Sequence, residues 1–501
     1  MFNAADLLRN FLPKELIPPF TSAPLADALQ SLPDVSKLSK PYSKLAYHSI
    51  PQSKGFRRLV SILNPLHQLR LAQVLESNAA DLLQRQSDST ISLSAFTIDG
   101  SSERVFRRAF PVENSGVERM VRAAGLRFVL RTDLSRYYQT IYTHSIPWAI
   151  HGKSAAKKDR SPALYGNLID TCVRNCQDQQ TLGIPVGPRS SDLIAETVGS
   201  ALDRRLQEKL GPLKGTRYVD DFHLYFRSRA DAENALATLG LVAKNLELEL
   251  NPSKTEIAEL PELIEPPWLT DVRAMHLRSD VGAQRFDLLA LFNTAFKSLR
   301  RYPTEPVLKY VVKQTLGAAI HQENWDVYES LLCHTIMADP ATLPVVTQIL
   351  LQYFRQDYAI NEDRIRSTLS EIVDYHGKLN HGFEVAWAIW LFSLLRIQIP
   401  EAVATLISAM EDTSVVLAAL DAREKGWLNA FDTSRWERMM APEELYSENW
   451  LISYEPIIKG WVRPNDDYVS DDDFFGALAA TRVSFYDETK DQPIYWTIYG
   501  G

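Results

Sequence analysis

The sequence predicts an α+β half followed by an all-α half built of helical repeats. Segments of apolar and β-branched residues with the two-residue period of strands occur before residue 260. From Asp287 to Leu451 apolar residues recur at helical spacing instead, and prolines divide this region into units of about 35–45 residues. This spacing indicates paired helices stacked as a HEAT-like solenoid.

Length and composition limit the classes of protein to which this chain can belong. The chain has 501 residues, more than a single compact core usually holds, with 45% apolar and 23% charged residues. Its net charge of −8 excludes a globally basic nucleic-acid binder, so any nucleic-acid surface must be local. Three cysteines are too few for a disulfide framework, and neither a signal peptide nor an apolar run of about 18 residues occurs. We therefore expect a cytoplasmic protein with no membrane segment.

The same patterns divide the chain into five segments. Prolines break the first segment into short helices, and a proline- and glutamate-rich stretch at 258–268 marks a domain boundary. The tail after Pro464 is acidic, and we expect it to be mobile. The predicted segments are an N-terminal helical extension (1–40), an α+β domain (41–260), a linker (261–286), an α-helical repeat domain (287–463) and an acidic tail (464–501).

A basic hairpin opens the α+β domain. Two predicted strands flank the turn Gln52–Gly55, and the basic side chains of this hairpin are Lys54, Arg57 and Arg58. Because arginine forks match phosphate oxygens, the hairpin is a candidate clamp for a triphosphate. The alternative is an exposed basic hairpin that binds nothing.

Two carboxylate motifs follow in this domain. A buried strand ends on Asp133 and leads into a helix start with the aromatic pair Tyr137 and Tyr138. Asp220 and Asp221 lie at the tight turn between two short predicted strands. Adjacent ionised carboxylates repel each other, and a divalent cation such as Mg²⁺ relieves that repulsion. Taken alone, the Asp-Asp pair is more typical of a solvated turn than of a metal site.

Two loops add candidate ligand contacts. Gly183, Pro185 and Gly187 form a rigid turn before an apolar helix, and glycine lets the backbone approach a ligand closely. Lys254 lies in a turn between two short predicted strands, from which its ammonium can reach a phosphate. Each loop is also compatible with an ordinary connection.

In this order, the motifs resemble the fingers and palm of reverse transcriptases. In that family a first Asp ends a strand ahead of an aromatic pair, as Asp133 does here. A Gly-Ile-Pro-x-Gly loop precedes a Tyr-x-Asp-Asp motif, as residues 183–187 precede residues 218–221. The stretch Leu-Asn-Pro-Ser-Lys-Thr at 250–255 is similar to the motif that comes next. The resemblance covers residues 40–260 and implies a reverse-transcriptase-like fold for them.

The resemblance also implies two-metal nucleotidyl transfer. Asp133, Asp220 and Asp221 would be the catalytic carboxylates and, with the Leu134 carbonyl, would hold two Mg²⁺ ions, for which Mn²⁺ can substitute. Tyr138 would exclude the ribose 2′-hydroxyl and so select dNTPs, and Lys254 would contact the pyrophosphate. The full set implied to bind the nucleotide is Lys54, Arg57, Tyr138, Gly183, Pro185, Gly187 and Lys254.

The architecture resembles one branch of the family. Val186 stands where many reverse transcriptases have Gln, and helical repeats follow the palm directly in place of a thumb with a nuclease or zinc module. This combination is similar to the bacterial abortive-infection (Abi) and defence-associated reverse transcriptases. That similarity implies antiphage defence in the bacterial cytoplasm, homo-oligomers, and DNA synthesis primed from a protein tyrosine, often without a conventional template. It implies a DNA product attached covalently to the protein and, as in some members, a non-coding RNA partner.

The priming group and two other functions stay open at this point. The candidate priming tyrosines are Tyr499, Tyr495, Tyr42 and Tyr47, and each can equally be a packing residue. The first alternative function is a conventional template-directed reverse transcriptase of retron or intron type. The second is a non-catalytic scaffold that binds RNA.

Overall fold

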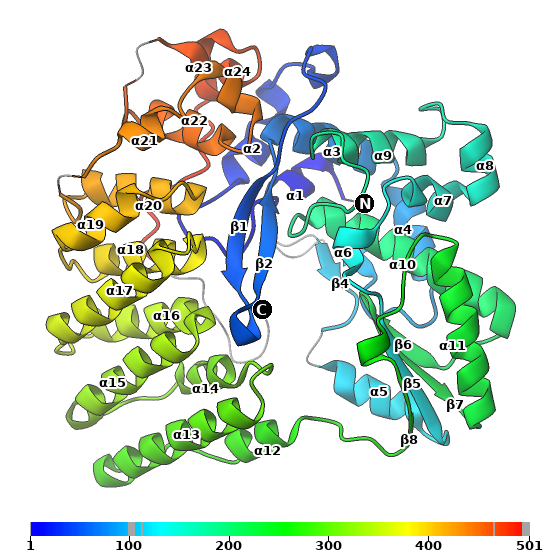
Figure 1. Cartoon of the computed structure of the whole chain (residues 1–501), viewed down its shortest axis with the longest axis horizontal. Coiled ribbons are helices and arrows are strands. Elements are labelled where there is room, and N and C mark those ends of the chain that lie inside the picture. The colour runs from blue at the N-terminus through cyan, green and yellow to red at the C-terminus, as the bar shows by residue number, and fades with distance from the viewer. Residues whose placement is uncertain (1, 99–105, 112–113, 430, 464–465, 493–501) are drawn as a thin grey trace.

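The computed structural model describes residues 2–98, 106–111, 114–429, 431–463 and 466–492. Its strands form a two-stranded sheet β1-β2, a two-stranded sheet β3-β4 and a four-stranded sheet of order β6-β7-β5-β8. The four-stranded sheet and the C-terminal helices lie on opposite sides of the molecule, and the β1–β2 hairpin lies between them (Figure 1). No helix in these ranges has both the length and the apolar character needed to cross a membrane.

The four-stranded sheet carries the predicted carboxylates. Its strands are β5 (Phe128–Asp133), β6 (Gly215–Tyr218), β7 (Asp221–Phe226) and β8 (Glu256–Glu259). All neighbouring strands are antiparallel, and in the β5–β7 register Phe128 pairs with Phe226 and Asp133 with Asp221. The end of β5 and the β6–β7 turn therefore meet at one end of the sheet.

Helices and two hairpins surround this sheet. The helices are α1 (Ala4–Leu8), α2 (Ala23–Asp27), α3 (Pro65–Ser77), α4 (Ala79–Ser87), α5 (Ser115–Ala123), α6 (Tyr137–Thr140), α7 (Ser145–His151), α8 (Lys153–Lys158), α9 (Tyr165–Asn175), α10 (Arg189–Leu210) and α11 (Arg229–Lys244). The hairpins are β1 (Ala46–Pro51) with β2 (Arg57–Ile62), and β3 (Phe96–Ile98) with β4 (Phe106–Arg108). The sequence predicted β1–β2 but not β3, β4 or α8. Such short elements depend on tertiary contacts, as when the Lys153 ammonium packs 4.1 Å from the Trp148 ring centroid.

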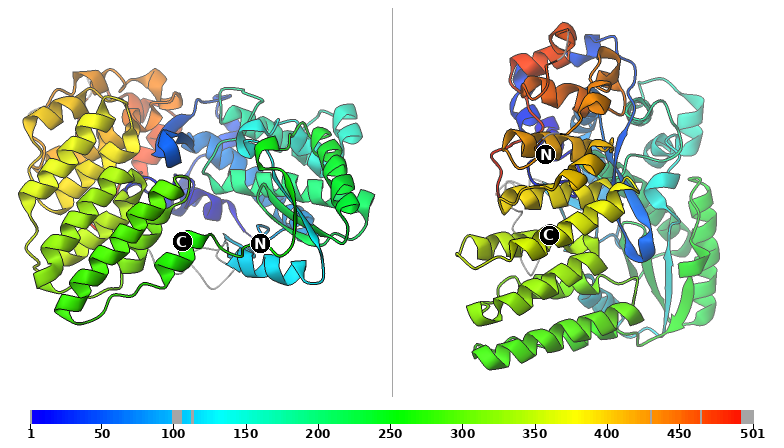
Figure 2. Two further views of the ribbon diagram at one scale, coloured as in Figure 1. Left: turned by 60° about the horizontal axis from the view of Figure 1, so that its bottom comes forward. Right: turned by 60° about the vertical axis from the view of Figure 1, so that its left-hand side comes forward.

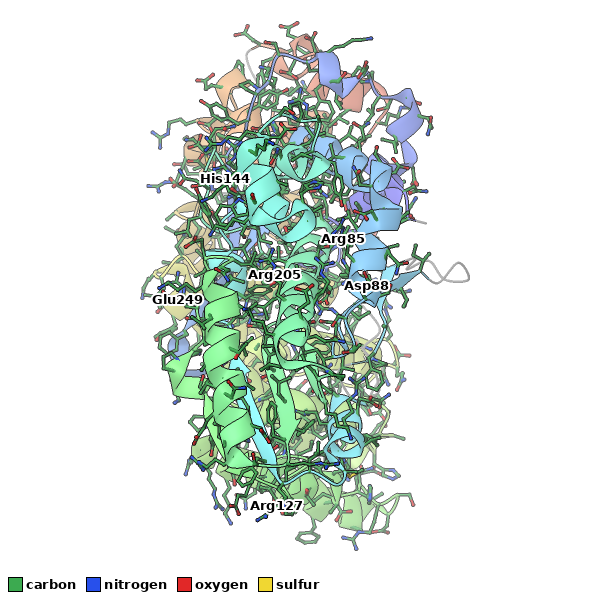
Figure 3. The ribbon with its side chains drawn as sticks, turned by 90° about the vertical axis from the view of Figure 1, so that its right-hand side faces the viewer. Arg85, Asp88, Arg127, His144, Arg205 and Glu249 are labelled. Atoms are coloured by element: carbon green, nitrogen blue, oxygen red, sulfur yellow. The ribbon has the colours of Figure 1, made fainter. Side chains whose placement is uncertain are left out.

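Successive residues of a strand point to opposite faces of the sheet. The two faces of the four-stranded sheet differ in the helices that pack on them. Phe222 and Leu224 of β7 are fully buried in the core, on the side where α11 packs against β5 and β7. Figure 3 looks onto this side, where α10 with its labelled Arg205 and α11 lie in front of the strands. Asp221 and His223 point to the other face, where α5 packs against β7. The carboxylates thus lie on the face that α10 and α11 leave open.

In the described residues after 266, every regular element is a helix. These are α12 (Pro267–Arg273), α13 (Val281–Arg301), α14 (Val307–Thr315), α15 (Gln322–Ala338), α16 (Leu343–Phe354), α17 (Glu362–Gly377), α18 (Gly382–Leu394), α19 (Glu401–Ser408), α20 (Thr413–Glu424), α21 (Ser434–Glu437), α22 (Trp450–Ile458), α23 (Tyr468–Asp471) and α24 (Phe475–Ala480). Helices α13 to α18 stack side by side (Figure 2). Helices α18 and α20 are apolar nearly all round, as buried helices are, and both pack against β1. The all-α region is therefore confirmed, and its assignment as a HEAT-like solenoid stays a prediction.

The acidic tail differs from the mobile segment that the sequence predicted. Phe474, Phe475, Phe485 and Tyr486 are fully buried. The Thr21 N–H donates to the Phe485 carbonyl at 2.9 Å, so this part of the tail pairs with the N-terminal segment. Aromatic residues between the aspartates supply enough apolar surface to anchor residues 466–492.

Candidate active site

Asp133, Asp220 and Asp221 converge at one end of the four-stranded sheet. Asp133 closes β5 and pairs with Asp221 at the start of β7. The Leu134 N–H donates to the Asp220 carbonyl at 3.1 Å, which places the two motifs side by side. The structure thus brings together the three carboxylates and the Leu134 backbone that the sequence analysis assigned to the metals.

The charges at this end of the sheet are incompletely balanced. Burial, together with the charge of Asp133, raises the pKa of Asp220. Burial is also the main cause that raises the pKa of Asp221 to about 6, against the opposing charge of Arg119. Asp133 is 6% exposed, and its Oδ1 is buried without a hydrogen-bond partner in the described structure. Crowded carboxylates with an unpaired buried oxygen are a donor set that suits Mg²⁺.

Lys254 approaches the carboxylates from a short 3₁₀ helix, η5 (Pro252–Lys254). Its Nζ forms an ion pair with Asp133 Oδ2, and this hydrogen bond raises the pKa of the lysine. The Asn251 N–H donates to the Asp133 carbonyl at 2.9 Å, which fixes η5 to the end of β5. The Lys254 side chain is 67% exposed, so it has room to turn toward a phosphate.

The glycine-proline loop has the rigid, close-packed backbone that the sequence predicted. Gly183 has φ +85°, and a Cβ there would lie 3.0 Å from the Gln139 carbonyl oxygen, so this position requires glycine. Pro185 is buried, and Gly187 is exposed with φ +118°. The loop can therefore pass close to neighbouring backbone where a larger residue would clash.

This loop also joins β2 to the turn that carries Tyr138. The Ile184 N–H donates to the Tyr138 carbonyl at 2.8 Å, and the Val186 carbonyl accepts from the Ser61 N–H at 2.7 Å. The Tyr138 hydroxyl donates to Asp192 Oδ1 at 2.7 Å, and burial raises its pKa well above the ordinary value. The ring that would select the sugar is thus held in one orientation.

The β1–β2 hairpin turns Arg58, and not Arg57, toward the carboxylates. The Arg57 guanidinium donates to both oxygens of the buried Glu384 of α18, at 2.9 Å for Nη2 to Oε2, and to Ser49 Oγ. Arg58 follows on the opposite face, is exposed, and lowers the pKa of Asp220 by its charge. The triphosphate role of Arg57 stays a prediction, and the sequence did not show that this face of β2 meets the helices. Lys54 is exposed at the hairpin tip.

A buried ion network under the Asp220–Asp221 turn was missed by the sequence analysis. Arg217 of β6 is fully buried. Its Nη2 lies 2.7 Å from Glu196 Oε1 and its Nε 2.9 Å from Asp203 Oδ1. The two carboxylates are seven residues apart on α10 and so share a face. Two acids two turns apart in the otherwise uncharged stretch 193–203 of α10 were the signal that could have revealed the network.

Two further neighbours of Asp221 were also missed. His223 shares its face, two residues along β7, and its Nδ1 lies 3.7 Å from Asp221 Oδ2. Arg119 of α5 lies 3.1 Å from His223 Nε2. Burial, with the charges of Arg119 and Arg131, lowers the pKa of His223 to about 3, so the imidazole is neutral at pH 7. The period of two along β7 was the available signal for His223.

Another group of metal-ligating side chains lies where the hairpin meets the helices. Ligand atoms of His376, His381 and Glu384 lie within 4.8 Å of one another. The Arg57 guanidinium already pairs with the Glu384 carboxylate, and the two imidazoles hydrogen-bond each other at 3.0 Å. These interactions satisfy the group without a cation.

Of the candidate priming tyrosines, Tyr42 is 46% and Tyr47 52% exposed. Tyr495 and Tyr499 lie outside the described residues. Two of the four candidates, Tyr42 and Tyr47, are therefore described residues that are accessible to solvent.

Comparison with known families gives the same interpretation as the geometry. Residues 50–289 match the family model described as "Reverse transcriptase (RNA-dependent DNA polymerase)". The chain contains a reverse transcriptase domain. The domain runs from β1 through the four-stranded sheet into α13, and it makes the chain an enzyme of the RNA-directed DNA polymerase type. The family resemblance is confirmed, while the defence branch is not tested by this match.

Solved structures similar to the chain include yeast telomerases. Apo telomerase from Candida tropicalis is 10% identical with a TM-score of 0.35, covering 78% of this chain and 70% of its own. Telomerase from Candida albicans with a TWJ fragment of telomeric RNA is 11% identical with a TM-score of 0.30, covering 66% of each chain. The corresponding complex from Candida tropicalis is 11% identical with a TM-score of 0.34, covering 80% and 64%. The chain thus spans 64–70% of the length of these telomerases, and no curated protein sequence matches it.

Proposed function

We propose that this chain is a DNA polymerase that adds dNTPs by two-metal nucleotidyl transfer, starts DNA on one of its own tyrosines and acts in bacterial antiphage defence. The observation that carries the polymerase assignment is the convergence of Asp133, Asp220 and Asp221 around a buried, unpaired carboxylate oxygen. The match of residues 50–289 to reverse transcriptases supports it.

The carboxylates would hold the metals from two strands. Asp133 from β5 and Asp220 with Asp221 from the β6–β7 turn lie at one end of the sheet, with the Leu134 backbone beside them. Two Mg²⁺ ions bound there lower the pKa of an attacking hydroxyl and stabilise the leaving pyrophosphate. The Lys254 ammonium lies beside Asp133, and from there it would donate a proton to that leaving group.

The chain's own residues would orient the nucleotide. Arg58 and Lys54 on the hairpin offer exposed cations to the triphosphate. The Tyr138 ring, fixed by Asp192, would exclude a 2′-hydroxyl. The backbone at Gly183, which a Cβ would block, lets the loop approach the base.

Protein priming and the defence role rest on the architecture. An all-α region follows the palm directly, as the resemblance to the Abi group suggested. Glu384 of this region pairs with Arg57 of the fingers hairpin. Tyr42, Tyr47, Tyr495 and Tyr499 are the candidate primers. Homo-oligomers and a non-coding RNA partner belong to the same proposal.

An incorporation assay separates the proposal from its alternatives. Purified protein is incubated with Mg²⁺ and labelled dNTPs, singly and together, with and without template and co-purified RNA. Products are resolved before and after protease. The control variants are Asp220→Asn, which removes a metal ligand, and Glu256→Gln, which changes an exposed carboxylate of β8 in the same sheet.

The proposal expects protease-sensitive, protein-linked DNA that Asp220→Asn abolishes and Glu256→Gln retains. Template-dependent product free of protein would replace protein priming with a retron-like activity. No incorporation under any condition would refute the enzyme and favour the scaffold. Mass spectrometry of tyrosine peptides then identifies the residue that carries the first nucleotide.

A further inference from the structure

The turn between β6 and β7 holds one residue in a strained conformation. Val219, between Tyr218 and Asp220, has φ +59°. Branched side chains avoid this left-handed region, and such outliers persist only where the surroundings enforce them. The two catalytic aspartates follow Val219 directly, so the conformation of Val219 sets where their side chains lie.

Two buried side chains hydrogen-bond the backbone of Val219, one at its N–H and one at its carbonyl. The Val219 N–H donates to Ser94 Oγ at 2.8 Å. The Val219 carbonyl accepts from Arg217 Nη1 at 2.7 Å. Ser94 and Arg217 are both fully buried, and Ser94 comes from the distant loop before β3.

One carboxylate of α10 binds both of these side chains. Glu196 Oε2 accepts from the Ser94 hydroxyl at 2.6 Å, and Oε1 accepts from Arg217 Nη2 at 2.7 Å. A Cβ on Gly199 would lie 2.8 Å from Arg217 Nη1, so α10 accepts a glycine in its interior where the guanidinium passes. Interior glycine weakens a helix, so space for the arginine outweighs local helix stability here.

Stability alone does not account for such a network. Buried ion networks often contribute less to stability than well-packed apolar residues of the same volume. They do fix one geometry, because each hydrogen bond constrains direction as well as distance. The geometry fixed here is that of the residue before Asp220.

We propose that Ser94 and Arg217 are positioning residues for nucleotidyl transfer. They hold Val219 in its strained conformation and thereby set Asp220 and Asp221 against Asp133. The inference rests on the proposed function of these aspartates as metal ligands. Ser94 and Arg217 act through Val219 and touch no substrate.

The test compares two serines that contact the same network. Ser94→Ala removes the acceptor of the Val219 N–H and leaves the Arg217 ion pairs intact. Ser200→Ala is the matched control, because Ser200 is buried and contacts Glu196 at 3.2 Å and Arg217 at 3.4 Å. Arg217→Lys is less informative because it unbalances two buried carboxylates and can prevent folding.

Three measurements are made on each full-length variant. For Ser94→Ala we expect kcat for dNTP addition to fall about 10-fold, the size of a lost buried hydrogen bond, with the dNTP KM unchanged. The Mg²⁺ concentration for half-maximal rate should rise, because the ligands are no longer aligned. Hydrogen exchange of peptides covering residues 216–222 should accelerate. Ser200→Ala should stay within about twofold of the parent in all three.

Equal kcat, Mg²⁺ dependence and exchange in the two variants would overturn the inference. A fall in kcat accompanied by faster exchange throughout the protein would also overturn it, since the serine would then be a general structural residue. Absence of incorporation by the unmodified protein refutes the proposed function instead. The exchange comparison requires no turnover, so it still decides whether Ser94 anchors the turn.

Discussion

Arg57→Ala should destabilise the protein without directly weakening nucleotide binding. The Arg57 guanidinium makes two hydrogen bonds to Glu384, whose side chain is 0% exposed, and two to Ser49, at its hydroxyl and its carbonyl. Removing one partner of a buried ion pair leaves the other charge unpaired and costs about 3–5 kcal/mol. The Arg57 side chain is 18% exposed, so we expect a loss at the low end, about 3 kcal/mol in the free energy of unfolding.

Urea denaturation followed by tryptophan fluorescence measures this loss. Trp387 lies in α18 three residues after Glu384 and is one of the ten tryptophans that contribute to the signal. The double variant Arg57→Met with Glu384→Leu removes both charges, and it should recover most of the stability because no ion is left buried alone. Recovery would show that the loss comes from the unpaired carboxylate.

The neighbouring arginine provides the contrast. Arg58 is exposed and faces Asp220, so Arg58→Ala should leave unfolding unchanged and raise the dNTP KM about 10-fold, as expected for one lost phosphate contact. If Arg57→Ala instead left the denaturation midpoint unchanged and raised the KM, the reasoning would be refuted. Arg57 would then leave Glu384 to bind the triphosphate, as the sequence first suggested.

Other perturbations address the sugar pocket, the metals and the C-terminal core. Tyr138→Ala should admit ribonucleotides, measured as the ratio of rNTP to dNTP incorporation, because the ring no longer blocks the 2′-hydroxyl. Since the pKa of Asp221 is raised to about 6, Mn²⁺ binding followed by electron paramagnetic resonance should be about 10-fold weaker at pH 5 than at pH 7. Burial raises the pKa of Glu455 from 4.5 to about 7. As the pH rises, the Glu455 carboxyl therefore loses its proton at a lower pH in the unfolded chain than in the folded protein. The free energy of unfolding should therefore fall by roughly 3 kcal/mol as the pH rises from 4.5 to about 7. Glu455→Gln should flatten that fall.

The local parts of the site were predictable from the sequence. Asp133 ends a strand, and Asp220 and Asp221 occupy a tight turn, and each feature depends on a few consecutive residues. The order of these motifs identified the polymerase domain, which the family match confirms. The glycine requirement at Gly183 also follows from a local backbone conformation.

The parts that depend on distant packing were not predictable. Arg57 and Arg58 have the same side chain, and only the position of α18 decides which of the two pairs with Glu384. The role of Ser94 depends on a loop more than one hundred residues from the turn it contacts. The burial of aromatic residues in the tail was not predictable for the same reason, because they pack against segments far away in the sequence.

That closure of the two ends has a consequence for synthesis. The Asp487 N–H donates to the Pro19 carbonyl at 2.7 Å, and the Phe20 and Tyr486 rings lie edge to face at 5.1 Å between centroids. Residues 19 and 20 leave the ribosome well ahead of residues 486 and 487, so their packing is complete only when the later residues have emerged. At about 5–20 residues per second, this delay lasts tens of seconds. The polymerase domain with its three converging carboxylates thus emerges before the segment that completes the packing of residues 19 and 20.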